Sequence, residues 1–337
     1  IPLNKFLSGE VATIKLDSDT TLDEIADVIL EGPPEIAVGR DIVLRILRHL
    51  ESGKNVILVG APGVGKTMLS KRILEIYGHH RTGNEYLRSV ATPDWSRYHV
   101  IGGINLQQEW HSGVVSKAAE EERWLLIDEF NRADINKAFG EMFLAIEDGN
   151  IPLTGEEQDI AKKETIKIPD EFRMIGTMND YDKNLLLTEL SYGLITRFAF
   201  IDIEPDQNKE KESVKNQIID SGLEIEEEDW NLCIDEIQKF FEFSKEVREW
   251  RMIGVRTTVD VIRYMVYASK SIDDTNKEKL DYLDEALCDY LLPQFDRLDK
   301  KTIEETEKAS QRMGAKRFTE KLTQMRKDLE GMSNFLS

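Results

Sequence analysis

The stretch that decides the fold is Asn55–Thr67, which reads N-V-I-L-V-G-A-P-G-V-G-K-T. Four apolar residues from Val56 to Val59 run into a glycine-rich turn, and a segment with helical apolar spacing follows from Met68. Strand, loop and helix in this order form the context in which the pattern G-x-x-x-x-G-K-[ST] binds phosphate. The sequence therefore predicts a phosphate-binding loop at the edge of a sheet.

The residue types in this loop suit a nucleoside triphosphate. Glycines let the backbone N–H groups approach an anion, and the following helix directs its positive end to the same point. We expect Lys66 to contact the β and γ phosphates and Thr67 to bind Mg²⁺. A glycine-rich turn that binds nothing is the alternative. The expected nucleotide-binding residues of the loop are Gly60, Ala61, Pro62, Gly63, Val64, Gly65, Lys66, Thr67 and Met68.

Composition limits the classes of function. The chain has 337 residues, 40% hydrophobic and 32% charged, which is typical of a globular protein with room for two domains. A net charge of −20 argues against direct capture of nucleic acid, so nucleic acid is expected only indirectly or through a partner. Cys233 and Cys288 lack metal-ligand spacing, and no apolar run has the length of a membrane span. We expect a cytoplasmic protein with no membrane contact and reduced cysteines.

A second motif lies at Trp124–Glu129, W-L-L-I-D-E. An apolar run of the parallel-strand type ends in two carboxylates, and ligands of open α/β sheets bind at strand carboxyl ends. We expect Asp128 to hold a magnesium-bound water and Glu129 to act as the general base. The alternative is a strand that simply ends in acids at a turn. A strand at Phe172–Thr177 would bring Asn179 to the same edge, where its amide could orient the attacking water.

The segments around these motifs differ in regularity. We expect a helix at Ile135–Asp148, a hairpin at Ile151–Ile168 and an irregular functional or anchoring loop at Ala91–Ala118. Gly78–Asn84, with its paired histidines, reads as a solvated loop rather than a metal site. A last strand is expected at Phe198–Ile203.

The sequence pattern changes twice along the chain. Residues 1–35 read as an N-terminal extension with a helix at Leu22–Leu30, and residues 36–206 as an α/β nucleotide-binding domain. Residues 207–337 are helical and acidic, which predicts a helical lid domain followed by C-terminal helices.

Several motifs resemble those of AAA+ nucleotidases of the MoxR and McrB groups. Ile127–Glu141, I-D-E-F-N-R-A-D-I-N-K-A-F-G-E, resembles their D-E-[IF]-N-R stretch. Three segments are similar to the McrB branch in particular, and these are Phe172–Asn179, Thr196–Ile201 and Leu291–Gln294.

The resemblance implies a P-loop core with a parallel central sheet and a helical lid, assembled as a homo-oligomeric ring, usually a hexamer. It makes Lys66, Thr67, Asp128 and Glu129 the Walker residues and Asn179 the sensor of the γ-phosphate. It also places the helix-2 insert of such rings, which projects toward the pore or a bound partner, within residues 91–118.

Two arginines and two base contacts are carried over in the same way. Arg197 matches the arginine finger that acts on a neighbour's nucleotide, with a surface arginine flanking a strand as the alternative. Arg256 matches the lid arginine called sensor 2, and Val38 and Gly39 fall where the family places the base.

Three functions follow from this resemblance. The first is a Mg²⁺-dependent ATPase that works as a ring motor and remodels a protein partner. The second is a McrB-like GTPase motor subunit of a DNA restriction or processing complex, and the third is a nucleotide-binding structural ring subunit. Lys183 and Thr196 depart from the arginines usual in McrB proteins, which favours ATP over GTP and the first function over the second.

Overall fold

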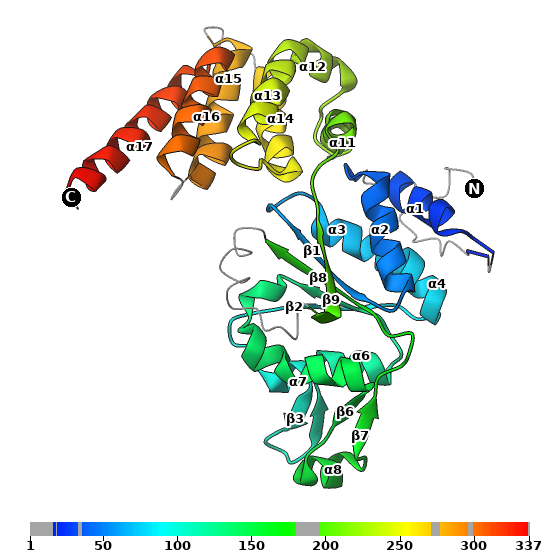
Figure 1. Ribbon diagram of the computed structural model, residues 1–337. Helices are drawn as coiled ribbons and strands as arrows, with labels where there is room; N and C mark the ends of the chain where they lie inside the picture. The colour runs from blue at the N-terminus through cyan, green and yellow to red at the C-terminus, as the bar shows by residue number, and fades with distance from the viewer. Residues whose placement is uncertain are drawn as a thin grey trace. The chain divides into compact units, whose positions relative to one another are not determined.

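We describe the protein from a computed structural model (Figure 1). It describes residues 16–17, 19–32, 36–179, 196–270, 277–295 and 299–335. The chain divides into two compact units between Glu204 and Pro205, and each unit is described by itself.

The first unit is built on a five-stranded parallel sheet with the order β2-β5-β8-β1-β9. All six residues of β1 are buried, because a parallel sheet is covered on both faces and needs apolar side chains on each. The predicted α/β class with a parallel central sheet is confirmed. The strands are β1 (Asn55–Gly60), β2 (Leu87–Val90), β5 (Leu125–Asp128), β8 (Met174–Asn179) and β9 (Phe198–Asp202).

Helices cover both faces of this sheet (Figure 1). On one side lie α2 (Arg40–Glu51) and α3 (Lys66–Ile73), and α1 (Leu22–Glu31) packs on α2 within the same unit. Arg40 of α2 holds α1 through ion pairs to Asp23 and Asp27.

The other face of the sheet carries α6 (Val114–Glu120) and α7 (Ile135–Asp148) (Figure 1). The bounds of α7 are those predicted, and Phe139, Met142 and Phe143 point into the core as expected. Phe139 stacks on Phe130 with ring centroids 4.2 Å apart, which packs the helix against the segment that follows β5.

The expectation of an irregular segment at Ala91–Ala118 is wrong. The chain forms α5 (Arg97–Val100), then an antiparallel hairpin of β3 (Gly102–Ile104) and β4 (Trp110–Ser112), and then α6. At two of its glycines another part of the backbone comes too close for a side chain. A Cβ on Gly113 would lie 2.5 Å from the carbonyl carbon of Val100, and Gly102 has a φ of 122°.

Two other polar segments are also more regular than expected. Most of Gly78–Asn84 is helical rather than a loop, because one turn of π-helix, η2 (Leu74–Gly78), continues into α4 (His79–Thr82), which is capped by Gly83 with a φ of 72°. The predicted hairpin at Ile151–Ile168 is present as β6 (Asn150–Pro152) paired with β7 (Thr165–Lys167), but its polar connection forms α8 (Gly155–Ala161). Polar composition alone does not distinguish a short surface helix from a loop.

The second unit is helical throughout its described residues. Its core includes Phe240, Phe243, Phe295 and Phe318, and both cysteines are buried and unpaired by a disulfide. No helix among the described residues is long and apolar enough to cross a membrane. The helices are α11 (Gln207–Ile219), α12 (Glu227–Leu232), α13 (Ile234–Val247), α14 (Val255–Ser269), α15 (Lys279–Ala286), η5 (Leu287–Leu291), η6 (Leu292–Phe295), α16 (Lys300–Met313) and α17 (Lys316–Phe335).

A buried ion pair fixes α11 in this unit. The guanidinium of Arg248 donates two hydrogen bonds of 2.5 Å to Glu210 and two more to the carbonyl oxygen of Ile253. Glu210→Ala should lower the free energy of unfolding by about 3–5 kcal/mol, because it leaves the arginine charge buried without a partner. Denaturant unfolding followed by circular dichroism measures this loss. Glu305→Ala, which breaks an exposed pair with Lys308, is the control and should cost about 1 kcal/mol or less.

Candidate nucleotide-binding site

The loop between β1 and α3 has the backbone geometry of a phosphate cradle. Gly63 and Gly65 have φ angles of 79° and 95°, a region that residues with a Cβ rarely adopt. At Gly60 a Cβ would lie 2.5 Å from the carbonyl oxygen of Ile203, so only glycine fits. Gly65 caps the N-terminus of α3, and the first N–H groups of this helix are therefore available to an anion.

Lys66 is buried and lies at the centre of this cradle. Its Nζ donates to the carbonyl oxygens of Gly60 and Ala61, each at 2.8 Å, and to Oδ1 of Asn179 at 3.1 Å. The contact with Asn179 follows from strand pairing, because Gly60 of β1 is the register partner of Asn179 in β8. Asn179 is the last residue of β8, whereas the sequence placed it just past the strand.

Asp128 ends β5 beside the cradle. Its Oδ1 accepts hydrogen bonds from Thr67 Oγ1 (2.8 Å) and Thr177 Oγ1 (2.5 Å), and its Oδ2 accepts from Arg88 Nη2 (2.9 Å). Burial alone would raise the pKa of Asp128, but these three donors hold it below its ordinary value of 3.8. The folded-state pKa is lowered, so this carboxylate stabilises the fold at neutral pH. That stability is lost as the pH falls below 3.8 through the folded-state pKa.

Glu129 turns out of the strand in a left-handed conformation with a φ of 54°, which is uncommon for a residue with a side chain. Its backbone N–H donates to Thr177 Oγ1 at 3.1 Å. Its carboxylate accepts from Asn179 Nδ2 at 3.1 Å and from Arg132 Nε at 3.2 Å. The structure thus brings Lys66, Thr67, Asp128, Glu129 and Asn179 into one hydrogen-bonded cluster.

Three residues that contact this cluster had no role assigned from the sequence. Thr177 was read only as part of a strand, although a threonine inside an otherwise apolar buried run is a signal for a specific hydrogen bond. Arg88 gave no such signal, because charged residues on strands are common. Arg132 was noted only as the arginine of the D-E-F-N-R stretch, without a role in the site.

Thr177 is expected to matter for the site because its hydroxyl joins Asp128 to the backbone of Glu129. Thr177→Val should lower the kcat of nucleotide hydrolysis by about 10- to 100-fold, since Asp128 is the expected metal-binding carboxylate and partners that orient such a group have effects of this size. Thr177→Ser keeps the hydroxyl and should restore most of the activity. Steady-state hydrolysis at several Mg²⁺ concentrations measures both variants. A loss in Thr177→Ser with none in Thr177→Val would mean that the methyl group, not the hydroxyl, is what the site needs.

The donors present fit Mg²⁺ together with a triphosphate. Mg²⁺ usually takes one or two protein oxygens and fills its other positions with water and phosphate oxygens, and Thr67 and Asp128 offer such a pair. In the described ranges no group of three or more His, Cys, Asp or Glu side chains forms another metal site.

The expected base contacts lie near the cradle. The side chain of Ile36 comes within 3.9 Å of where a Cβ on Gly65 would be, which places the start of the 36–39 segment beside the loop. Val38 is buried and its N–H donates to the carbonyl oxygen of Ile36, while Gly39 caps α2.

Two predicted site residues lie outside the cluster. Arg197 immediately precedes β9. Because Phe198 pairs with Asn55 at the start of β1, Arg197 lies at the ends where the strands begin, whereas the cradle follows the end of β1. Its side chain is 18% exposed and forms an ion pair with Glu147 of α7. Arg256 belongs to the second unit, where it is the second residue of α14 and is exposed. Lys183 lies outside the described residues.

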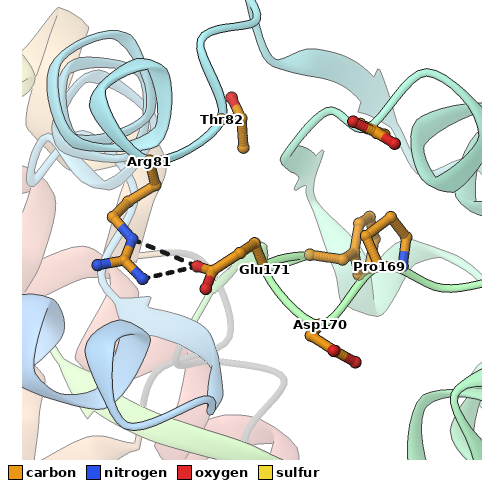
Figure 2. A pocket seen from close by; sticks show the side chains of 7 residues that line it. Arg81, Thr82, Pro169, Asp170 and Glu171 are labelled. Atoms are coloured by element: carbon orange, nitrogen blue, oxygen red, sulfur yellow. Dashed lines mark hydrogen bonds and ion pairs between the residues drawn. The ribbon is translucent and has the colours of Figure 1, made fainter.

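A separate pocket of 230 Å³ lies at the edge where the strands begin (Figure 2). It is lined by residues that precede β5 and β8, among them Glu122 and Phe172, and by Arg81 and Thr82 of α4. Figure 2 shows Arg81 directed at Glu171, with which it forms an ion pair. The cradle is at the other ends of the strands, so this pocket is not the nucleotide site.

Comparison with known proteins agrees with this geometry. Residues 55–198 match the family described as AAA domain (dynein-related subfamily). Over 176 residues the chain is 31% identical to the McrB subunit of a type IV methyl-directed restriction enzyme of Escherichia coli K12. This alignment covers 48% of this chain and 37% of that subunit. Residues 55–198 therefore form an AAA domain, and the segment similar to the McrB subunit covers about half of the chain.

The chain is also similar to other proteins over smaller shares of their length. It is 28% identical to midasin of Giardia intestinalis over 49% of its own length and 33% identical to midasin of Dictyostelium discoideum over 26%. These matches span 3% and 2% of the two midasins, so the chain spans well under half the length of its curated relatives. The crystal structure of NtrX from Brucella abortus shares the fold, with a TM-score of 0.50, 12% identity, and coverage of 86% of this chain and 68% of that one.

Proposed function

We propose that this AAA+ protein is a Mg²⁺-dependent NTPase that cleaves the β–γ phosphoanhydride bond, with ATP as the expected substrate and GTP as the alternative. It acts as a homo-oligomeric ring, expected to be a hexamer, that remodels a protein partner. The clustering of Lys66, Thr67, Asp128, Glu129 and Asn179 at one sheet edge supports hydrolysis.

In this proposal each residue of the cluster has one task. Lys66 and the N-terminus of α3 hold the β and γ phosphates, and Thr67 and Asp128 hold the metal. Bound Mg²⁺ would neutralise charge on the phosphate oxygens. Glu129 takes the proton of the attacking water, and Asn179, already hydrogen-bonded to both Lys66 and Glu129, orients that water against the γ-phosphate.

The observation that supports a ring is the place of Arg197. The length of β1 separates Arg197 from the cradle of its own chain, which is about 17 Å at ~3.3 Å per residue. No arginine side chain spans that distance. If Arg197 contacts a nucleotide, the nucleotide is bound to a neighbouring copy, and each active site is then shared between two copies.

The test is hydrolysis of ATP and of GTP by the purified chain with Mg²⁺, measured over a wide range of protein concentration. We expect the activity per subunit to rise steeply as rings assemble. A constant activity per subunit at every dilution would contradict the shared site. An absence of hydrolysis with both nucleotides, at concentrations where the chain is assembled, would leave the structural ring subunit as the function.

A second function is favoured by the likeness to the E. coli restriction subunit. In it the chain is the motor of a DNA-processing complex, and DNA contacts come from a partner because the chain carries a net charge of −20. DNA that stimulates hydrolysis in a salt-sensitive way, in the presence of a candidate nuclease partner, would support it. Hydrolysis that is indifferent to DNA with and without such partners would exclude it.

A further inference from the structure

Arg88 contacts the expected metal-binding carboxylate from a strand that carries none of the known motifs. It lies on β2, whose Val90 is the register partner of Asp128. Its guanidinium reaches along the strand to Asp128 Oδ2 at 2.9 Å. The Arg88 side chain is 42% exposed and that of Asp128 only 9%, so the arginine approaches a buried acid from the solvent side.

The two oxygens of Asp128 are used differently. Oδ1 accepts from both Thr67 and Thr177, which satisfies the lone pairs of that oxygen. Thr67 can keep this hydrogen bond while its own lone pair faces a metal. The oxygen left for a metal ion or its bound water is Oδ2, and that is the oxygen that Arg88 holds.

Arg88 takes one lone pair of Oδ2 and leaves the other open, so a divalent ion on this oxygen would lie close to the guanidinium and the two cations would repel each other. An ion pair this close is strengthened by the low dielectric around a buried partner, so a metal must displace a real attraction. The arginine can move into water without unpacking the fold, because its long side chain is already 42% exposed.

We propose that Arg88 is a positioning residue that competes with Mg²⁺ for Asp128 Oδ2 and neutralises this carboxylate until the metal arrives. The inference rests on the nucleotide site proposed above. With Arg88 on Asp128, a triphosphate can enter the cradle without meeting an unpaired negative charge. Metal binding then releases the arginine, so Arg88 sets how strongly nucleotide and Mg²⁺ depend on each other.

The test is equilibrium binding of N-methylanthraniloyl-ATP to the full chain, first in EDTA and then at increasing Mg²⁺. In Arg88→Gln we expect several-fold weaker binding in EDTA, because the charge on Asp128 then repels the phosphates. We expect the half-saturating Mg²⁺ concentration to fall about tenfold, because the competing cation is gone; loss of a supporting outer-shell partner has an effect of this size in the opposite direction. Arg88→Lys keeps a cation and should lie between this variant and the wild type.

Lys167→Gln is the control, since it removes one positive charge from an exposed position on β7. It should change neither the affinity for the probe in EDTA nor the half-saturating Mg²⁺ concentration. Equal weakening with and without Mg²⁺ in Arg88→Gln, or an unchanged or higher half-saturating Mg²⁺, would overturn the competition. Suppose that the wild-type chain binds the probe with Mg²⁺, and that Arg88→Gln shows the same dependence of probe binding on Mg²⁺ as the wild type. Only this inference then fails. If the wild-type chain binds no probe at saturating Mg²⁺, the proposed nucleotide site fails as well.

Discussion

Glu129→Gln should bind ATP with near wild-type affinity and hydrolyse it on the order of 10³-fold more slowly. The substitution removes the base and keeps the shape of the side chain. The residues expected to hold the nucleotide and the metal make their contacts without the Glu129 carboxylate. Lys66 donates to Gly60 and Asn179, and Asp128 accepts from Thr67 and Thr177. Equilibrium binding and single-turnover hydrolysis measure the two effects separately.

Glu156→Gln, an exposed change on α8, is the control and should keep both binding and turnover. Wild-type turnover in Glu129→Gln would show that another group takes the proton. The slow variant would also hold the ATP-bound state, so a partner that depends on this state should co-purify with it in ATP and leave in ADP. The same experiment with GTP would show which base the protein prefers.

Arg197→Ala should reduce hydrolysis by about 10³-fold or more while each copy still binds nucleotide, since an arginine finger contributes about 10³–10⁵ to kcat. The cradle of each copy is intact in this variant, and only the group offered to the neighbour is lost. Lys66→Ala has the opposite defect, because it cannot hold phosphate but keeps Arg197. Mixing the two inactive variants should therefore restore part of the activity, as rings form with intact sites at mixed interfaces.

Glu147→Gln separates this role from a structural one. In the described chain Arg197 is paired with Glu147, so a catalytic arginine must leave that carboxylate to reach a neighbour. If Arg197 only supports the fold through this pair, Glu147→Gln should lose as much activity as Arg197→Ala. If it acts on a neighbour's nucleotide, Glu147→Gln should keep or raise the activity. No recovery in the mixed rings would contradict a shared site.

The core of the fold and the candidate site could be predicted because they are encoded locally. In Asn55–Thr67 and Trp124–Glu129 a buried strand and its functional end are contiguous in sequence. Parallel strands bring such ends to one edge of the sheet, so the meeting of Lys66, Asp128 and Asn179 needed no knowledge of strand order.

What could not be predicted depends on contacts between distant segments. Arg88 reaches Asp128 only because β2 is the neighbour of β5, and Thr177 reaches it only because β8 lies on the other side. The hairpin at β3–β4 was missed for a related reason. Gly102 and Gly113 break regular structure in a local reading, yet in the fold they allow the backbone of one segment to touch another.

The strand β9 lies between the expected arginine finger and the start of the second unit. Arg197 stands immediately before it and the second unit begins three residues after it, while hydrogen bonds to β1 fix its register. Deleting one residue within β9 would turn every later side chain of the strand to the opposite face of the sheet. Among natural variants of this chain, insertions and deletions should therefore accumulate in surface turns such as the β3–β4 tip and be purged from Phe198–Asp202.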